Sequence, residues 1–282
     1  MTEATLQGLS RYGAAFLTER GVEDAAFDAR QLLQHLFSLN GTGFLLQSER
    51  SVSESEKEAY EALLRRRASG EPLQYILGQW DFCGGTFAVG PGVLIPRPET
   101  EQLAEICVEA ARMRGRITVY DLCAGTGCIG LTVAEACPQA NVYLLELHEA
   151  ALNYLKKNEA AFALSNTYAV RADVLNGPPE ALPAPDLIVS NPPYIRAGEI
   201  PGLQREVGFE PETALDGGED GYLFYHAIAE KWLPLLPPGG FAAVECGEGQ
   251  PETVAELFGP YLDCAVVDDL YGVSRFVTGN KL

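Results

Sequence analysis

The chain has 282 residues, of which 47% are hydrophobic, and this length and composition allow a large domain with a full core plus a small one. Its 20 Lys and Arg face 39 Asp and Glu, and the formal net charge of −19 repels phosphate backbones, which disfavours direct contact with nucleic acid. The seven Cys form no C-x-x-C pair and the three His lie far apart, so neither a disulfide framework nor a metal site is expected.

The N-terminal residues show no targeting signal. They contain neither a basic stretch nor an apolar one, and no segment of the chain approaches about 18 uninterrupted apolar residues. We therefore expect an unprocessed cytoplasmic protein that does not contact a membrane, holds no metal and acts as a monomer.

Residues 1–70 carry apolar side chains at helical spacing and lack convincing strand patterns. Leu6, Leu9 and Phe16 are examples. This spacing predicts a small all-α bundle as the N-terminal domain. The only basic run of the chain, Arg65 to Arg67, is interpreted as a solvated helix end, with ribosomal RNA or an acidic partner face as the alternative contact.

Residues 71–98 follow as a connector. Gly70 and Pro72 break the preceding helix. Residues 75–78 and 82–89 alternate around Gly84 and Gly85 as the two strands of a hairpin would. We predict a β-hairpin between the two domains.

Residues 99–282 alternate strands with helical segments, which is typical of βαβ units. Two more apolar segments near the C-terminus, joined through Tyr271 and Gly272, indicate an antiparallel pair at the sheet edge. The predicted class is α/β, with a Rossmann-like, mostly parallel seven-stranded sheet whose last strand is antiparallel. Strands are expected at residues 117–122, 142–145, 168–171, 187–190, 241–245, 264–267 and 274–278, and helices at residues 129–136, 150–162 and 221–236.

Thr100 and Glu101 stand at the start of this larger domain, after the stretch Pro-Arg-Pro-Glu. Thr is a good N-cap and acidic residues suit the first turn of a helix. We predict that these two residues cap the first helix of the domain.

A glycine-rich loop joins the strand at residues 117–122 to its helix. Glycines let the backbone approach a ligand, and the helix N-terminus offers free N–H groups to a carboxylate or phosphate. Glu146 ends the next strand, where a carboxylate can accept hydrogen bonds from both ribose hydroxyls. Together they predict an adenosine-type cofactor site. Its loop residues are Asp121, Cys123, Ala124, Gly125, Thr126 and Gly127.

The spacing Gly125-x-Gly127-x-x-Gly130 also matches the dinucleotide fingerprint, so a nicotinamide enzyme is an alternative. Asp121 favours S-adenosylmethionine over a nicotinamide cofactor, because an acid-led D-x-x-x-G-x-G loop is typical of S-adenosylmethionine enzymes. In those enzymes the ammonium group of the ligand is an indirect partner for the carboxylate. An ordinary tight turn is the third interpretation, and Cys123 is taken as an inert small residue within it.

Asp173 and Val174 follow the third strand and are assigned to the same cofactor site. Two roles are equally compatible with Asp173: its carboxylate accepts a hydrogen bond from an adenine amine, or it is simply solvated.

Residues 191–194 read Asn-Pro-Pro-Tyr directly behind a buried strand, where an open α/β sheet binds its ligands. Asn191 offers a side-chain carbonyl, Pro192 a backbone carbonyl without a donor, and Tyr194 an aromatic face. This set suits a planar nitrogen that carries two hydrogens. We expect Asn191, Pro192 and Tyr194 to be catalytic and Pro193 to join them in binding substrate, with a capped Pro-rich turn as the alternative.

The Asn-Pro-Pro-Tyr sequence is found in methyltransferases that act on planar amine or amide nitrogens. Residues 70–78 (GEPLQYILG) and 93–101 (VLIPRPETE), with residues 210–211 and 214–221, resemble the PrmC (HemK) family, the glutamine-N5 methyltransferases of peptide chain release factors. The likeness runs from about residue 60 to the C-terminus, and a helical domain of the expected size precedes it.

The resemblance implies S-adenosylmethionine as methyl donor, with S-adenosylhomocysteine as product, and the Gln of the Gly-Gly-Gln motif in a class I release factor as acceptor. It also implies that residues 1–70 dock this protein substrate and that Thr100 and Asn191 line the cofactor pocket. Glu146 stands where the family usually has Asp, and Cys123-Ala124 replaces a Gly-Thr-like pair. Both departures leave the expected activity in place.

Three alternatives stay open at this stage. An adenine-N6 methyltransferase on DNA or RNA is the nearest, because an exocyclic amine satisfies the same acceptors, although the acidic charge argues against it. A dehydrogenase would need a catalytic His or a Lys-Tyr pair, which the chain does not provide. A non-catalytic binding module is disfavoured by the presence of the glycine loop, Glu146 and Asn-Pro-Pro-Tyr in one chain.

Overall fold

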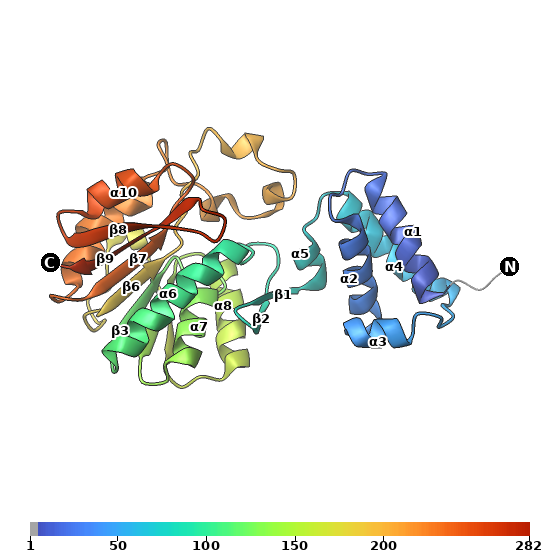
Figure 1. Ribbon diagram of the computed structural model, residues 1–282, viewed down its shortest axis with the longest axis horizontal. Helices are drawn as coiled ribbons and strands as arrows, with labels where there is room; N and C mark the ends of the chain where they lie inside the picture. Colours follow the sequence, from blue (N-terminus) through green and yellow to red (C-terminus); the bar gives the residue numbers. More distant parts are fainter. Residues whose placement is uncertain (1–4) are drawn as a thin grey trace. The chain divides into compact units, whose positions relative to one another are not determined.

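The computed structural model, shown in Figure 1, describes residues 5–282. The chain divides into two compact units. We call residues 5–79 together with Gln204–Phe209 the helical unit, and Trp80–Leu203 together with Glu210–Leu282 the sheet unit. A short segment near residue 206 therefore belongs to the helical unit, although its neighbours in sequence belong to the sheet unit.

The helical unit is built from amphipathic helices whose apolar faces meet in its core. Leu6 of α1, Leu32 of α2 and Tyr60 of α4 are completely buried. Helix α4 begins with a capping box in which Ser53 and Glu56 satisfy each other's backbone N–H groups. The predicted helical character of this region is confirmed. The helices are α1 (Leu6–Thr18), α2 (Ala25–Phe37), α3 (Gly41–Leu46), α4 (Glu54–Ala68) and α5 (Leu73–Leu77), with a 3₁₀ turn at Val207–Phe209.

The basic run at the end of α4 is solvated at Arg65 and Arg66, as predicted, but not at Arg67. The Arg67 side chain is only 7% exposed, and it donates to Asp28 Oδ2 at 2.6 Å and to Glu206 Oε1 at 2.5 Å. A buried guanidinium needs such partners, and the carboxylates lie far from it in sequence, so the helix pattern could not reveal them. Arg66 pairs with Glu71 at 2.6 Å and Arg65 with Glu61 at 3.6 Å.

The connector is a hairpin as predicted, but its first part is helical. Strands β1 (Gln79–Phe82) and β2 (Gly85–Ala88) form a two-stranded sheet. Cys83 and Gly84 between them both have positive φ, as a tight hairpin turn requires. The first strand is predicted at residues 75–78, but residues 73–77 form the helix α5, which ends at Gly78 in the left-handed conformation. A short apolar run fits a buried helical turn as well as a strand, so periodicity could not decide.

The sheet unit contains a seven-stranded sheet in the order β5-β4-β3-β6-β7-β9-β8. Strand β9 runs antiparallel to both of its neighbours, and the β3, β4, β5, β6 and β7 pairings are parallel. This confirms the predicted class, a mostly parallel sheet with an antiparallel last strand. The strands are β3 (Thr118–Leu122), β4 (Asn141–Glu146), β5 (Thr167–Arg171), β6 (Leu187–Ser190), β7 (Phe241–Glu245), β8 (Leu262–Asp268) and β9 (Ser274–Lys281).

Helices cover both faces of the sheet (Figure 1). Leu103 of α6 and Leu131 of α7 belong to the core on one face, and Trp232 and Phe258 belong to the core on the other. The α-helices of this unit are α6 (Pro98–Arg114), α7 (Cys128–Ala136), α8 (Glu149–Phe162), α9 (Leu223–Ala227) and α10 (Pro251–Phe258); α9 continues into a π turn (Ile228–Trp232) and a 3₁₀ turn (Leu233–Leu235), and further 3₁₀ turns lie at Val174–Asn176, Ile200–Gly202 and Glu212–Ala214.

Helix α10 was missed at the sequence level. It has only eight residues, and its buried apolar positions are Val254 and Phe258, which is too few for a helical period to stand out. The strand order reverses around β3, with β4 on one side and β6 on the other. In open α/β sheets such a switch point leaves a crevice at the carboxyl ends of the strands.

Candidate active site

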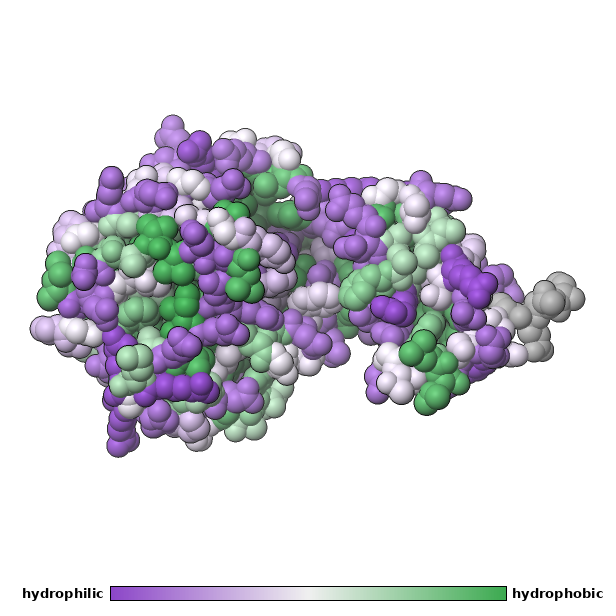
Figure 2. Space-filling model, in the orientation of Figure 1, coloured by the Kyte–Doolittle hydropathy of each residue, from purple (hydrophilic) through white to green (hydrophobic). Residues whose placement is uncertain are grey.

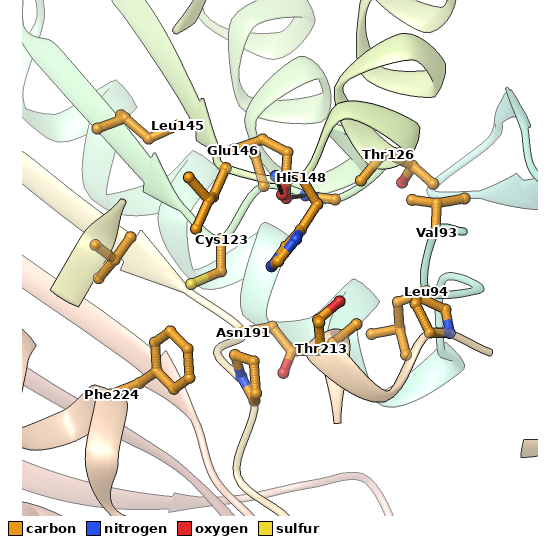
Figure 3. Close-up of a pocket in the computed structure, with 18 of the residues that line it drawn as sticks. Val93, Leu94, Cys123, Thr126, Leu145, Glu146, His148, Asn191, Thr213 and Phe224 are labelled. Carbon is orange, nitrogen blue, oxygen red and sulfur yellow. Dashed lines mark hydrogen bonds between the residues drawn. The ribbon is translucent and has the colours of Figure 1, made fainter. Parts of the chain in front are cut away.

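A cavity of about 330 Å³ lies in the sheet unit at the carboxyl ends of β3, β4, β5 and β6. In Figure 3, Cys123 and His148 extend from the loops after β3 and β4 towards a space that Asn191 and Thr213 border from the opposite side. Of the predicted site residues, those lining the cavity are Thr100, Cys123, Ala124, Gly125, Thr126, Glu146, Asp173, Val174, Asn191 and Pro193. Asp121, Gly127, Pro192 and Tyr194 lie around it without lining it.

The glycine loop turns sharply between β3 and α7. Cys123, Gly125 and Gly127 have positive φ values of 59°, 56° and 81°, a conformation that glycine adopts at low cost. Asn158 of α8 holds the loop, since its Nδ2 donates to the Thr126 carbonyl at 2.9 Å. The backbone of the loop is therefore fixed before any ligand arrives.

Gly130 has a packing reason rather than a conformational one. A Cβ at this position would lie 2.2 Å from Leu144 Cδ2 and 2.9 Å from Asp121 Oδ2. The third glycine of the loop thus lets α7 pack closely on the sheet.

Asp121 is buried beneath the loop with 1% exposure. Its Oδ2 accepts from Gly130 N at 2.9 Å, whereas Oδ1 has no hydrogen-bond partner within the described part of the chain. Burial, with a smaller contribution from the neighbouring Glu146 carboxylate, raises the pKa of Asp121 to about 7, although the hydrogen bond from Gly130 N opposes the shift. A buried acceptor without a donor beside the cavity fits a ligand that brings a positive charge.

Glu146 lines the cavity at the end of β4. Its Oε2 accepts from Gly125 N at 3.0 Å and its Oε1 accepts from His148 N at 2.7 Å. The carboxylate is thereby aimed across the glycine loop. Each of its oxygens keeps a second lone pair, so the group can still accept from a diol such as that of ribose.

Asp173 is half-buried and is not a plain solvated carboxylate. Its Oδ1 accepts from Leu175 N at 2.9 Å and its Oδ2 accepts from Asn176 Nδ2 at 2.7 Å. It thus caps the 3₁₀ turn after β5 while lining the cavity with Val174.

The Asn-Pro-Pro-Tyr loop begins where β6 ends. Ser190 Oγ donates to the Leu122 carbonyl at 2.7 Å, which ties the ends of β6 and β3 together. Asn191 and Pro193 face the cavity. The two prolines cannot donate and have fixed φ, so this loop keeps its shape at low entropic cost.

Tyr194 lies in a tightly packed corner formed by two glycines. A Cβ on Gly217 would lie 2.7 Å from Tyr194 Cα, and a Cβ on Gly247 would lie 3.1 Å from Tyr194 Cδ2. Gln250 Nε2 donates to the Tyr194 carbonyl at 3.0 Å. Burial raises the pKa of the Tyr194 hydroxyl, so the phenol stays neutral.

Thr100 does not cap a helix, contrary to the prediction. Helix α6 begins at Pro98, with Arg97 at the N-cap position, because proline is preorganised for a first helical turn. Thr100 is 2% exposed, donates to Glu245 Oε2 at 2.7 Å and accepts from Asn191 Nδ2 at 3.1 Å. It lines the cavity, which is the role that the family resemblance implied.

Cys123 faces the cavity with its thiol in the protonated form. Burial raises the pKa of its thiol well above the ordinary value, and the Glu146 and Asp121 carboxylates raise it further. The thiolate is the reactive form of cysteine, so this side chain is inert at neutral pH.

Several cavity residues were missed by the sequence interpretation. Val93 and Leu94 precede the Pro-Arg-Pro-Glu stretch, His148 follows Glu146, and Thr213 and Phe224 come from the region after β6. The blocks around residues 93–101 and 210–221 indicate a family likeness in the sequence but no individual cavity residues other than Thr100. Apolar and hydroxyl side chains are common throughout the sequence, so their chemistry alone does not identify them as residues of a binding site.

Residues 5–282 contain neither a cluster of metal-binding side chains nor a membrane-spanning helix. In that range no group of three or more His, Cys, Asp and Glu could hold a metal ion. Among the same residues, no helix combines the length and the apolar composition needed to cross a membrane.

Comparison with known proteins defines the class first. The family described as "Methyltransferase small domain" matches residues 99–205, which include strands β3 to β6, the glycine loop and the Asn-Pro-Pro-Tyr loop. The catalytic domain of hMettl16 shares this fold, with a TM-score of 0.57 and 15% identity, covering 77% of this chain and 81% of that one.

The family is shown by a second domain match and by relatives that match nearly the whole chain. The "PrmC N-terminal domain" matches residues 9–78. The release factor glutamine methyltransferase of Geobacter sulfurreducens is 36% identical and covers 98% of this chain and 96% of its own length. That of Nitratidesulfovibrio vulgaris is 36% identical, with 99% and 96% covered. The chain belongs to the release factor glutamine methyltransferase family, which confirms the resemblance.

Proposed function

We propose that this enzyme transfers a methyl group from S-adenosylmethionine to the side-chain amide nitrogen, N5, of the glutamine in the Gly-Gly-Gln motif of a class I peptide chain release factor. One observation carries the proposal beyond family membership. Asn191 faces the cavity with its Nδ2 donating to Thr100 Oγ1, which leaves its Oδ1 available to accept from a substrate N–H.

The cavity suits the proposed cofactor. The glycine loop presents backbone N–H groups at the start of α7, Glu146 can accept from the ribose hydroxyls, and Asp121 offers a buried acceptor towards a positive charge. When bound, the cofactor supplies a methyl group on an electrophilic sulfonium. The role of Asp173 and Val174 towards the adenine belongs to the same proposal.

The protein's part in the reaction is positioning. An amide nitrogen is a poor nucleophile because its lone pair is delocalised. If Asn191 Oδ1 and the Pro192 carbonyl accept its two N–H hydrogens, the free lobe is aimed at the methyl donor, and orientation supplies most of the catalysis. Because Pro192 and Tyr194 do not line the cavity itself, this arrangement places the substrate amide at the edge of the cavity, where the Tyr194 ring would stack on it. No strong base is required, since the nitrogen becomes acidic once it is methylated.

A protein substrate is favoured over adenine in DNA or RNA. The net charge is −19, and the only basic run is neutralised, because Arg65, Arg66 and Arg67 all pair with carboxylates of the helical unit. A nucleic-acid enzyme normally presents a basic face to the phosphates.

The helical unit is assigned to docking of the release factor. Leu45 and Leu46 of α3 are 71% and 81% exposed, and Figure 2 shows a hydrophobic patch over this part of the helical unit. Adjacent exposed leucines of this kind are typical of a protein-binding surface. The same proposal places the reaction in the cytoplasm and assigns it to a monomer.

The proposal is tested with labelled S-adenosylmethionine, a purified release factor, its variant with Gln→Ala in the Gly-Gly-Gln motif, and bulk DNA and RNA. Label should enter only the release factor with the intact Gln. Asn191→Ala should lower kcat at least about 100-fold while the cofactor Kd changes little. Label in nucleic acid but not in the release factor would refute the assignment.

A further inference from the structure

Asn191 is held by a chain of hydrogen bonds that ends at a buried carboxylate. Asn191 Nδ2 donates to Thr100 Oγ1 at 3.1 Å, and Thr100 Oγ1 donates to Glu245 Oε2 at 2.7 Å. Glu245 ends β7 and is 2% exposed, and its backbone carbonyl accepts from the Tyr225 hydroxyl at 2.8 Å. The β7 end, the first turn of α6 and the loop after β6 are thereby joined.

The direction of these hydrogen bonds, from donor to acceptor, follows from the chemistry of the three side chains. An ionised carboxylate can only accept, so the single hydroxyl hydrogen of Thr100 is directed to Glu245. The Thr100 oxygen can then only accept, and Asn191 must present its amino group to it. The carbonyl oxygen of Asn191 is therefore turned the other way.

We propose that Glu245 is a positioning residue that acts through Thr100 to set the amide orientation of Asn191, so that the carbonyl oxygen of Asn191 faces the nitrogen to be methylated. This inference rests on the proposed function. With the amide reversed, the amino group of Asn191 would meet the N–H hydrogens of the substrate, and the substrate would lose one of its two acceptors.

Glu245 also makes the orientation sensitive to pH. Burial, with a smaller contribution from the charge of Glu99, raises the pKa of Glu245 to about 7. The hydrogen bond from Thr100 and the charges of Arg275 and Arg97 oppose this shift. The titratable and charged groups around it are Arg97 and Glu99 at the start of α6, Arg275 on β9, Tyr194 after β6, Tyr225 on α9 and Cys246 next to it in the chain.

Protonation of Glu245 reverses the direction of the hydrogen bonds that run through Thr100 to Asn191. A neutral Glu245 carboxyl can donate to Thr100, which then donates to Asn191 and turns its amide over. Because the pKa is raised to about 7, the productive orientation is populated above pH 7 and lost as the pH falls through 7. At saturating cofactor, kcat should rise with pH across this range.

The test compares two variants at one position. Thr100→Val keeps the shape and removes the hydroxyl, so kcat for methylation of the release factor should fall about 10- to 100-fold, the cost of leaving polar groups unpaired or misdirected. Thr100→Ser restores the hydroxyl and should recover most of kcat. Both variants are compared at saturating cofactor, and cofactor Kd is measured by calorimetry, so that a loss of cofactor binding at the cavity wall is separated from the loss of kcat.

Glu245→Gln supplies the second measurement. A Gln side chain can either accept from or donate to Thr100, so kcat should be lowered and its dependence on pH near 7 should disappear. Thr100→Val with wild-type kcat, or Glu245→Gln with the wild-type pH profile, would overturn the inference. The proposed function would be untouched by either result, since it fails only if the wild-type enzyme does not methylate the release factor glutamine.

Discussion

Asn191 and Thr100 lie 91 positions apart in the sequence, yet a hydrogen bond joins their side chains at the cavity wall. The contact exists because β6 and α6 deliver their ends to the same edge of the sheet. In the proposed mechanism, substrate orientation therefore depends on a threonine that has no chemical reactivity of its own. The Thr100 and Glu245 variants described above test this at the scale of single atoms.

Glu146 shows how a longer side chain fills a position usually taken by Asp in the resembled family. The additional methylene lets its two oxygens reach Gly125 N and His148 N at 3.0 Å and 2.7 Å. The carboxylate therefore supports two loops at once. Its orientation is set by backbone donors, which do not depend on the identity of neighbouring side chains.

Tyr194 provides a test of stacking against hydrogen bonding. If the ring orients the substrate amide, Tyr194→Phe should keep kcat/KM within about 3-fold, and Tyr194→Ala should lower it roughly 10- to 100-fold because stacking is lost. Steady-state kinetics with the release factor measures both. Equal losses in the two variants would assign the effect to the hydroxyl instead.

At the scale of elements, the segment at residues 73–77 illustrates how context decides conformation. Three apolar residues in a row satisfy a strand or a single helical turn equally well. Pro72 before them and Gly78 after them, the latter left-handed with φ 73°, bound one short helix. Tyr75 and Ile76 are then buried, and the hairpin starts only at Gln79.

Arg67 provides the prediction for helix α4. Its guanidinium is buried between Asp28 and Glu206, so Arg67→Ala leaves carboxylates without their partner and should destabilise the helical unit by about 3–5 kcal/mol. Arg65→Ala is the matched control, because the Arg65 side chain is 62% exposed and should cost less than about 1 kcal/mol. Hydrogen exchange of α2 and α4 measures both. Similar exchange rates in the two variants would contradict the structural role assigned to Arg67.

At the scale of the whole molecule, the proposed roles of the two units are docking of the release factor by the helical unit and methyl transfer in the sheet unit. If α3 docks the release factor, Leu45→Ser with Leu46→Ser should raise the KM for the release factor about 10-fold, because the exposed apolar contact is lost. The KM for the cofactor should not change, since the cavity is lined only by residues of the sheet unit.

Met113→Ser is the control for the leucine variant. Met113 is 85% exposed on α6, so its replacement also removes an exposed apolar side chain but from the other unit. Equal effects of the two changes on the KM for the release factor, or no effect of the leucine change, would show that α3 does not take part in docking.

The sequence by itself determined the class and most of the elements. Helical spacing in residues 1–70, the alternation of strands and helices after residue 99, the glycine loop and Asn-Pro-Pro-Tyr were all readable, because each depends on residues that are neighbours in the chain. Family likeness then narrowed the substrate to a release factor glutamine.

Only the tertiary structure decided which side chains meet. It placed Thr100 between Asn191 and Glu245 rather than at a helix cap, buried Arg67 against two carboxylates, and brought Thr213 and Phe224 to the cavity. These contacts join residues far apart in sequence. They depend on strand order and on how loops pack at the carboxyl edge of the sheet. Neither can be inferred from the local periodicity of the sequence.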